Sequence, residues 1–267
     1  RWFVHSVFVN DCRIGEVSGF VPENETANAT GSFRMGKGIK RVRIVFPWNE
    51  CSRISSLELD DGASFAPVKA EKTVLIYGDS ITHGYDALLP SRKYVSQLAQ
   101  YLEAEEHNKA IGGDWFFPEL VLQKEDFEPD YISVAYGTND WNGQEHDRTV
   151  ENANGFYAKL RATYPKAKIF AITPIWRGDN DRITKVGTFE EGVWIVRDAA
   201  AAQEGPDAGL QLQNVEGLGQ VIVHTVVKAD QLVHIIGLGG EHDDGNVRKL
   251  PDFAAGGQTV HIGHHNI

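Results

Sequence analysis

The stretch Thr73-Val-Leu-Ile-Tyr-Gly-Asp-Ser-Ile-Thr82 decides the fold, because it joins a buried strand to a turn that carries a serine. Thr73–Tyr77 is a short apolar run of the kind found in strands buried on both faces. Gly78 makes a sharp turn sterically possible, so Ser80 is placed at the carboxyl end of the strand. A hydroxyl held there can attack a carbonyl carbon. Taken alone, Asp79 and Ser80 fit a helix N-cap equally well.

Downstream of this stretch, apolar strands alternate with amphipathic helices. Repeated β-α units predict a parallel sheet with right-handed crossovers and helices on both faces. Ligands bind such sheets at the carboxyl ends of the strands, so we expect the chemistry in the loops that begin at Gly78 and Gly137. The expected elements are a helix over Ser91–Glu105, a strand over Tyr131–Tyr136, a helix over Val150–Tyr164, a strand over Lys168–Thr173, and a helix from the capping box Thr188–Glu191 to about Gln203.

Upstream, residues 1–69 have a different texture. Short β-type runs over Trp2–Val9, Arg41–Phe46 and Ile54–Leu59 are separated by Gly, Pro, Asn and Asp. We therefore expect a small all-β domain, sandwich-like or jelly-roll-like, over residues 1–69 and an α/β domain over residues 70–267. After about residue 205 the pattern is poorly defined, and Gln220–Val227 is the one good strand candidate there.

Composition limits the classes of function. The 267 residues are 42% hydrophobic, enough for a sizeable core, and carry a net charge of −11, which disfavours a nucleic acid partner. No apolar run reaches the roughly 18 to 20 residues of a membrane-spanning helix, so we expect a soluble chain of undetermined compartment. Cys12 and Cys51 have no metal-ligand spacing and are expected to be free thiols. We expect no metal and no cofactor, and the oligomeric state is open.

Three blocks in order give the chain a resemblance to the SGNH (GDSL-like) hydrolase superfamily. They are Gly78-Asp-Ser-Ile-Thr82, Asn108-Lys-Ala-Ile-Gly-Gly113 and Gly137-Thr-Asn-Asp140. The resemblance covers roughly residues 40 to 200 and looks like a bacterial two-domain type related to carbohydrate acetylesterases. It implies a flavodoxin-like, three-layer α/β/α hydrolase domain behind the β domain, with Ser80 as the nucleophile.

The same resemblance implies an oxyanion hole made of the Ser80 N–H, the Gly113 N–H and the Asn139 side chain. Gly112 is the neighbouring alternative to Gly113. Glycine allows the backbone to approach a tetrahedral centre closely, and an asparagine amide is a neutral donor that needs no proton transfer. Without the other blocks, Gly112-Gly113 fits a plain turn and Asn139 an Asx-turn, with Asp140 as a turn residue.

The base is the open part of the predicted site. A serine hydroxyl needs a base to take its proton, and in this family a late Asp-x-x-His block supplies histidine and acid. No such block follows residue 200, and the nearest approach is Ala229-Asp-Gln-Leu-Val-His234. We take His234 with Asp230 as the expected pair. The rival histidines are His224, His242, His261, His264 and His265.

Further residues are expected to contact the substrate because they adjoin the blocks or follow strands. These are Asp79, His83, Trp141 and Trp176. The expected function is a serine esterase that acts on a small-molecule or glycan ester, with O-acetyl groups on a carbohydrate as the substrate that the resemblance implies. The alternative is a catalytically silent carbohydrate-binding protein on an SGNH scaffold, since the late block is absent.

Overall fold

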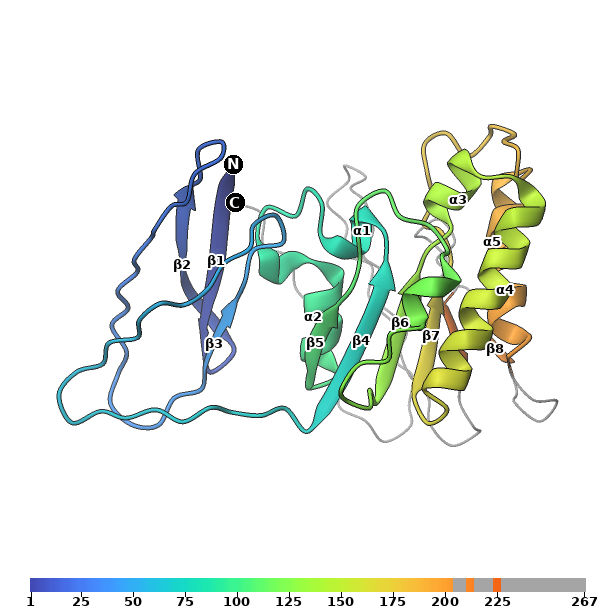
Figure 1. Ribbon diagram of the computed structural model, residues 1–267. Helices are drawn as coiled ribbons and strands as arrows, with labels where there is room; N and C mark the ends of the chain where they lie inside the picture. The colour runs from blue at the N-terminus through green and yellow to red at the C-terminus, as the bar shows by residue number, and fades with distance from the viewer. Residues whose placement is uncertain (204–209, 214–222, 227–267) are drawn as a thin grey trace, which may run out of the picture.

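Two β-sheets organise the part of the chain that the computed structural model describes, residues 1–203, 210–213 and 223–226 (Figure 1). One is a three-stranded sheet in the order β2-β1-β3, and the other a six-stranded sheet in the order β5-β4-β6-β7-β9-β8. The strands are β1 (Trp2–Val9), β2 (Cys12–Phe20), β3 (Val42–Val45), β4 (Lys72–Gly78), β5 (Ala104–Asn108), β6 (Tyr131–Ala135), β7 (Lys168–Ile172), β8 (Leu210–Gln213) and β9 (Val223–Val226). The helices are α1 (Ser80–His83), α2 (Tyr94–Tyr101), α3 (Thr138–Gly143), α4 (His146–Thr163) and α5 (Phe189–Ala201), with 3-10 turns η1 (Pro90–Arg92) and η2 (Pro118–Val121).

Strand β4 lies inside the larger sheet, between β5 and β6, as its apolar run predicts. Successive side chains of a strand point to opposite faces. Leu75 and Tyr77 accordingly pack into the core under α4 and α5, whereas Val74 and Ile76 pack against α2. Helices thus cover both faces of the sheet (Figure 1), which confirms the predicted α/β architecture.

The larger sheet is parallel only in part. Strands β5, β4, β6 and β7 are parallel, as expected, but β9 runs antiparallel to β7 and β8 antiparallel to β9. Parallel neighbours need a crossover of a dozen or more residues, and only residues 214–222 separate β8 from β9. The expectation of a parallel sheet therefore holds for the four strands that carry the three sequence blocks.

The N-terminal residues form an antiparallel sheet, and two of their three predicted strands are confirmed. Strands β1 and β3 match the runs Trp2–Val9 and Arg41–Phe46. The run Ile54–Leu59 is exposed and forms no strand, since it pairs with none of the strands of the N-terminal sheet. Instead, β2 pairs with β1 along its whole length.

The segment 46–52 connects this N-terminal sheet to the α/β unit. The Asn49 side-chain amide donates to the Trp2 carbonyl oxygen at 2.6 Å, and the Trp48 indole N–H donates to the Ala87 carbonyl oxygen at 3.2 Å. Elsewhere at the junction, the Ser91 hydroxyl donates to the Ser6 hydroxyl at 3.1 Å. The N-terminal sheet is therefore attached to the loop that follows α1.

The helix predictions are correct in place and differ at their ends. The capping box forms at α5, where Glu191 N–H donates to the Thr188 hydroxyl at 3.2 Å and the Glu191 carboxylate accepts from Thr188 N–H at 2.6 Å. The helix predicted over Ser91–Glu105 is shorter, since α2 ends at Tyr101 and Glu103 takes a positive φ of 52°. Strand β5 begins at the next residue, Ala104.

Two further expectations from the sequence concern the cysteines and membrane-spanning helices. Cys12 and Cys51 are both exposed and free, as expected. Among the helices described, none is long and apolar enough to cross a membrane.

Candidate active site

The turn that carries Ser80, the predicted nucleophile, begins where β4 ends. Ser80 is the first residue of α1, and backbone N–H groups in the first turn of a helix have no partner within the helix. Gly78 must lack a side chain, because a Cβ there would overlap Thr82. Ser80 is partly exposed, and its hydroxyl makes no hydrogen bond with the residues that the structure describes. The turn thus presents a hydroxyl and a backbone donor together.

Asp79 caps this turn and is buried. Its carboxylate accepts from Ile81 N–H at 3.0 Å, and the residue is only 3% exposed. Burial raises the pKa of this carboxyl, and the backbone N–H groups of Ile81 and Thr82 oppose the shift. The side chain thus serves the helix cap, and a contact between Asp79 and substrate stays a prediction.

The second block follows β5 and lies against α1. Ile111 N–H donates to the Gly78 carbonyl oxygen at 3.1 Å, and the Asn108 side-chain amide donates to the Thr82 carbonyl oxygen at 3.0 Å. A Cβ built on Gly112 would lie 3.8 Å from the Ser80 Cβ. Gly113 has a φ of 83°, which glycine adopts readily. The Gly112-Gly113 backbone therefore passes directly beside Ser80.

The third block joins the second through Asn139. Its Nδ2 donates to the Asp114 carbonyl oxygen at 2.8 Å. That bond uses one of the two amide hydrogens and fixes the amide plane next to Gly113. The other N–H is left for a ligand. The structure therefore brings together the loops of Ser80, Gly113 and Asn139, as the three blocks predict.

Asp140 holds the second and third blocks in this arrangement. Its carboxylate accepts from Phe116 N–H and from Gly137 N–H, both at 3.1 Å, and the residue is 1% exposed. Burial is the main cause of a rise in its pKa to about 7, which the two backbone N–H groups oppose. The interpretation of Asp140 as a turn residue agrees with these contacts.

We expect the Asp140 carboxyl to titrate near neutral pH in the folded protein. Because its folded pKa is raised, its contribution to stability is complete below the unfolded pKa near 4 and is lost as pH rises through about 7. A carbon-13 NMR titration of labelled aspartate should show this midpoint. An Asp140 midpoint near the ordinary aspartate value of about 4 would contradict the prediction.

The two candidate tryptophans differ in exposure. Trp141 is fully buried, its indole N–H donates to the Gly187 carbonyl oxygen at 3.1 Å, and the Arg177 and Arg182 guanidinium groups lie over its ring. Trp141 is covered by α5 and these arginines, and its contact with substrate stays a prediction. Trp176, in the loop after β7, is 53% exposed and available for contact.

His83 lies one helical turn from Ser80, as its place in the sequence requires. Its ring makes an edge contact with Trp48, with centroids 5.8 Å apart. His107 packs instead on Phe127, 4.1 Å between centroids. His234, Asp230, His242, His261, His264 and His265 lie outside the described residues, and of His224 only the backbone in β9 is described.

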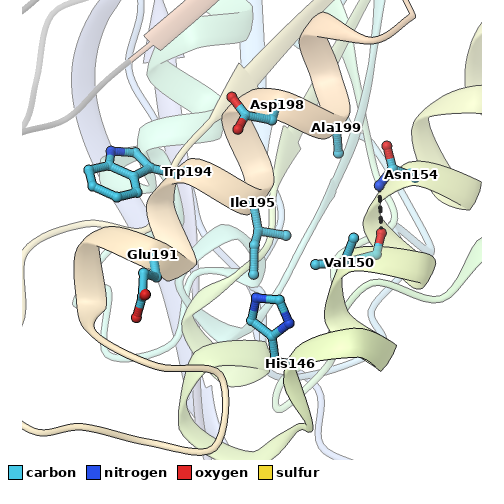
Figure 2. Close-up of a pocket in the computed structure, with 8 residues that line it drawn as sticks. All are labelled: His146, Val150, Asn154, Glu191, Trp194, Ile195, Asp198 and Ala199. Carbon is cyan, nitrogen blue, oxygen red and sulfur yellow. Dashed lines mark hydrogen bonds between the residues drawn. The ribbon is translucent and has the colours of Figure 1, made fainter.

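A hollow of about 270 Å³ lies elsewhere on the molecule, between α4 and α5 (Figure 2). His146 and Val150 of α4 face Ile195 of α5 across it, and Trp194 is at its outer side. Among the described residues, none that is predicted for catalysis lines it. It is a surface feature separate from the nucleophile turn.

A family model agrees with this arrangement of three loops. The model of the GDSL-like lipase/acylhydrolase family matches residues 76–210, just over half of the chain. The chain belongs to the GDSL-like lipase/acylhydrolase family. This confirms the resemblance drawn from the three blocks and assigns the chain to the GDSL-type esterases.

Solved structures share the fold of this GDSL-like family member at low identity. The salicylyl-acyltransferase SsfX3 from a tetracycline biosynthetic pathway is 19% identical, with a TM-score of 0.61 over 84% of this chain and 69% of that one. A carbohydrate esterase family 2 enzyme of Clostridium thermocellum, solved with cellohexaose, is 16% identical, with a TM-score of 0.56 over 76% and 70%. The family 2 enzyme of Corynascus thermopiles (Myceliophthora fergusii) is 16% identical, with a TM-score of 0.55 over 76% and 75%. A search of curated proteins finds no significant match.

The sequence prediction missed the residues that connect the loops of this GDSL-like site. Asn108 and Asp114 flank the glycines, and both take part in the bonds that hold the blocks together. The Asp114 carboxylate also accepts from the Tyr136 hydroxyl at 3.3 Å. Asn108 ends a strand and precedes a glycine pair, and this position was the available signal for a loop-fixing role.

Proposed function

We propose that the protein is a serine esterase that hydrolyses O-acetyl groups on a carbohydrate through an acyl-enzyme on Ser80. One observation carries the proposal: Ser80, Gly112-Gly113 and Asn139 come from three separate loops and meet at one edge of the sheet. Such convergence of a hydroxyl with neutral donors suits acyl transfer, in which negative charge develops on a carbonyl oxygen.

The reaction follows from these groups. The Ser80 oxygen attacks the ester carbonyl carbon, and its proton passes to a base. The Ser80 N–H, the Gly113 N–H and the free Asn139 N–H stabilise the tetrahedral oxyanion. Collapse of this intermediate expels the alcohol, which takes up the proton, and leaves an acyl-serine. Water then attacks the acyl-serine, which releases the carboxylic acid and restores the serine.

We assign the base to His234, oriented by Asp230. The support is the sequence Ala229-Asp-Gln-Leu-Val-His234, the nearest match to the late block of the family. A histidine with a carboxylate partner takes a serine proton effectively near neutral pH. The assignment lies outside the described residues and rests on the sequence.

The choice of a carbohydrate acetate draws on two kinds of support. The similar structures include carbohydrate esterases, one of them solved with cellohexaose. In this chain, exposed Trp176 and partly buried His83 lie near the ends of the strands where ligands bind. We further propose that residues 1–69 form a separate small β domain, sandwich-like or jelly-roll-like, ahead of a hydrolase domain over residues 70–267.

We expect Asn139→Ala to lower kcat for 4-nitrophenyl acetate by roughly 10² to 10³-fold, because loss of one oxyanion donor costs about 3 kcal/mol in the transition state. Asn142→Ala is the matched control, since Asn142 is on the same helix but exposed and bonded to Arg182. Steady-state kinetics measure both variants. Equal rates for Asn139→Ala and Asn142→Ala would exclude the amide from the oxyanion hole.

The proposal is tested by acetate release and by covalent labelling. The protein should release acetate from 4-nitrophenyl acetate and from acetylated xylan, and a fluorophosphonate probe should modify the peptide that contains Ser80. Mass spectrometry locates the modified residue. Labelling at another residue, or none, would refute the acyl-enzyme on Ser80.

A second candidate is a family member that binds carbohydrate without hydrolysing it. The absence of Asp-x-x-His after residue 200 favours it. It predicts binding of a glycan with neither acetate release nor reaction with the probe. The same two assays therefore separate the candidates.

A further inference from the structure

Tyr85 is an exposed aromatic residue tied to the nucleophile turn. It is 64% exposed, and its backbone N–H donates to the Ser80 carbonyl oxygen at 2.9 Å. The Gly84 N–H donates to the same oxygen at 3.0 Å, and Gly84 has a φ of 108°. The ring therefore leaves the chain directly after the four-residue helix that begins with Ser80.

Trp48, from the segment that attaches the N-terminal sheet, holds this ring. The two rings make an edge contact, with centroids 5.6 Å apart and planes at 60°. Trp48 is itself fixed by its indole hydrogen bond to the Ala87 carbonyl oxygen and by its edge contact with His83. Tyr85 is thus exposed and positioned at the same time, which lowers the entropy cost of binding a ligand to its ring.

The backbone beneath the pair is packed and leaves little freedom. A Cβ on Gly84 would overlap the Lys93 side chain and lie 3.4 Å from the Trp48 Cβ. The Lys93 ammonium forms an ion pair with Glu106 at 2.9 Å and is 8% exposed. The turn that carries Tyr85 therefore packs on the ion pair between Lys93, just before α2, and Glu106 of β5.

Tyr85 directly follows α1, and Trp48 belongs to the segment that attaches the N-terminal sheet. In Figure 1 the N-terminal sheet lies beyond α2 and β5, whereas α3, which carries Asn139, is on the other side of α1. Of the proposed oxyanion donors, Asn139 is on α3, so a carbonyl oxygen held by it would place the small acyl group toward α3. The alcohol part of an ester bound to Ser80 then extends toward Tyr85.

We propose that Tyr85, braced by Trp48, is the platform on which a sugar ring stacks while its ester group reaches Ser80. The inference rests on the proposed function and names the residue that selects the alcohol. The apolar C–H face of a pyranose packs on an aromatic ring, and the phenol hydroxyl offers a polar edge to the sugar hydroxyls. Trp48 acts through Tyr85 as a positioning residue.

The kinetic test compares two esters that share the acetyl group. Tyr85→Ala should raise KM for an acetylated xylo-oligosaccharide about tenfold, an effect at least five times larger than on 4-nitrophenyl acetate. Tyr85→Phe should keep most of the affinity, since the ring remains. Trp194→Ala removes another half-exposed aromatic, 49% exposed beside the hollow of Figure 2, and should behave as the unmodified protein.

Two kinetic outcomes overturn the platform. One is Tyr85→Ala with an unchanged KM for the oligosaccharide. The other is a loss of equal size on both esters, which indicates a structural role in the nucleophile turn. Trp48→Ala should raise KM for the oligosaccharide, as Tyr85→Ala does. An unchanged KM in the Trp48→Ala variant would remove Trp48 from the proposal.

A binding measurement keeps this inference separate from the esterase proposal. Saturation-transfer NMR with xylohexaose and Ser80→Ala requires no turnover. A signal that is present with Ser80→Ala and lost in Ser80→Ala/Tyr85→Ala supports the platform even when no acetate is released. A signal of equal size in both variants, or none in either, contradicts it.

Discussion

Ser80→Ala should abolish esterase activity, with kcat for 4-nitrophenyl acetate lowered by roughly 10⁵-fold or more. The reason is that alanine removes the atom that forms the acyl-enzyme, whereas the oxyanion donors on the other two loops remain. Those donors account for whatever slow hydrolysis persists above the rate in water. Initial rates with purified protein measure the loss.

The same substitution should leave stability unchanged. The Ser80 hydroxyl makes no hydrogen bond with the described residues, so its removal leaves no buried partner unsatisfied there. Urea unfolding of Ser80→Ala should therefore match that of the unmodified protein. Ser56→Ala, at an exposed position of the N-terminal segment, is the control for loss of a hydroxyl. Equal rates for the unmodified protein and Ser80→Ala would end the nucleophile assignment.

His234→Ala should lower kcat by a factor of at least about a thousand, as removal of the base does in related triads. The oxygen of serine is a weak nucleophile while it keeps its proton, and no other group among the described residues bonds to it. His242→Ala, in the same C-terminal stretch, is the comparison. An active His234→Ala together with an inactive His242→Ala would move the role of base to His242.

Replacement of Asp230 tests whether a carboxylate orients His234. If it does, Asp230→Asn should lower kcat and should slow the reaction with the fluorophosphonate probe in parallel. If Asp230→Asn retains full rate, the histidine is oriented by another acid.

Strand β4 could be predicted because Val74–Tyr77 is an uninterrupted apolar run. The strand is buried on both faces, and its short length and the glycine that follows it favour a strand over a buried helix. Strand β5 was missed for the opposite reason. It lies at the sheet edge, and its sequence Ala-Glu-Glu-His-Asn is polar because Glu106 pairs with Lys93 and His107 stacks on Phe127.

The N-terminal sheet shows the same limit in another form. Strand β2 contains Gly15 and Gly19, which disfavour a strand on propensity alone. A Cβ on Gly15 would come within 2.8 Å of the Phe33 ring, and one on Gly19 within 2.7 Å of the Phe3 ring. The glycines are therefore needed by aromatic packing from distant positions, which no local pattern reveals.

At the candidate site, the sequence blocks predicted which loops come together, but they did not predict the contacts of individual side chains. The loops of Ser80 and Asn139 were expected at strand ends, where the structure has them, whereas Gly113 was assigned from its block alone. Trp141 and Asp79 were assigned to the substrate side by adjacency, and both are buried in the scaffold because α5 covers one and the α1 N-terminus binds the other. Position in a loop does not determine which way a side chain points.

The indole of Trp48 lies outside residues 76–210, which the family model matches, yet it contacts the turn that carries Ser80. The proposed platform thus combines a family segment with a side chain from outside it. On that proposal, mutations in the segment 46–52 would change which alcohol is accepted while all three blocks keep their sequence.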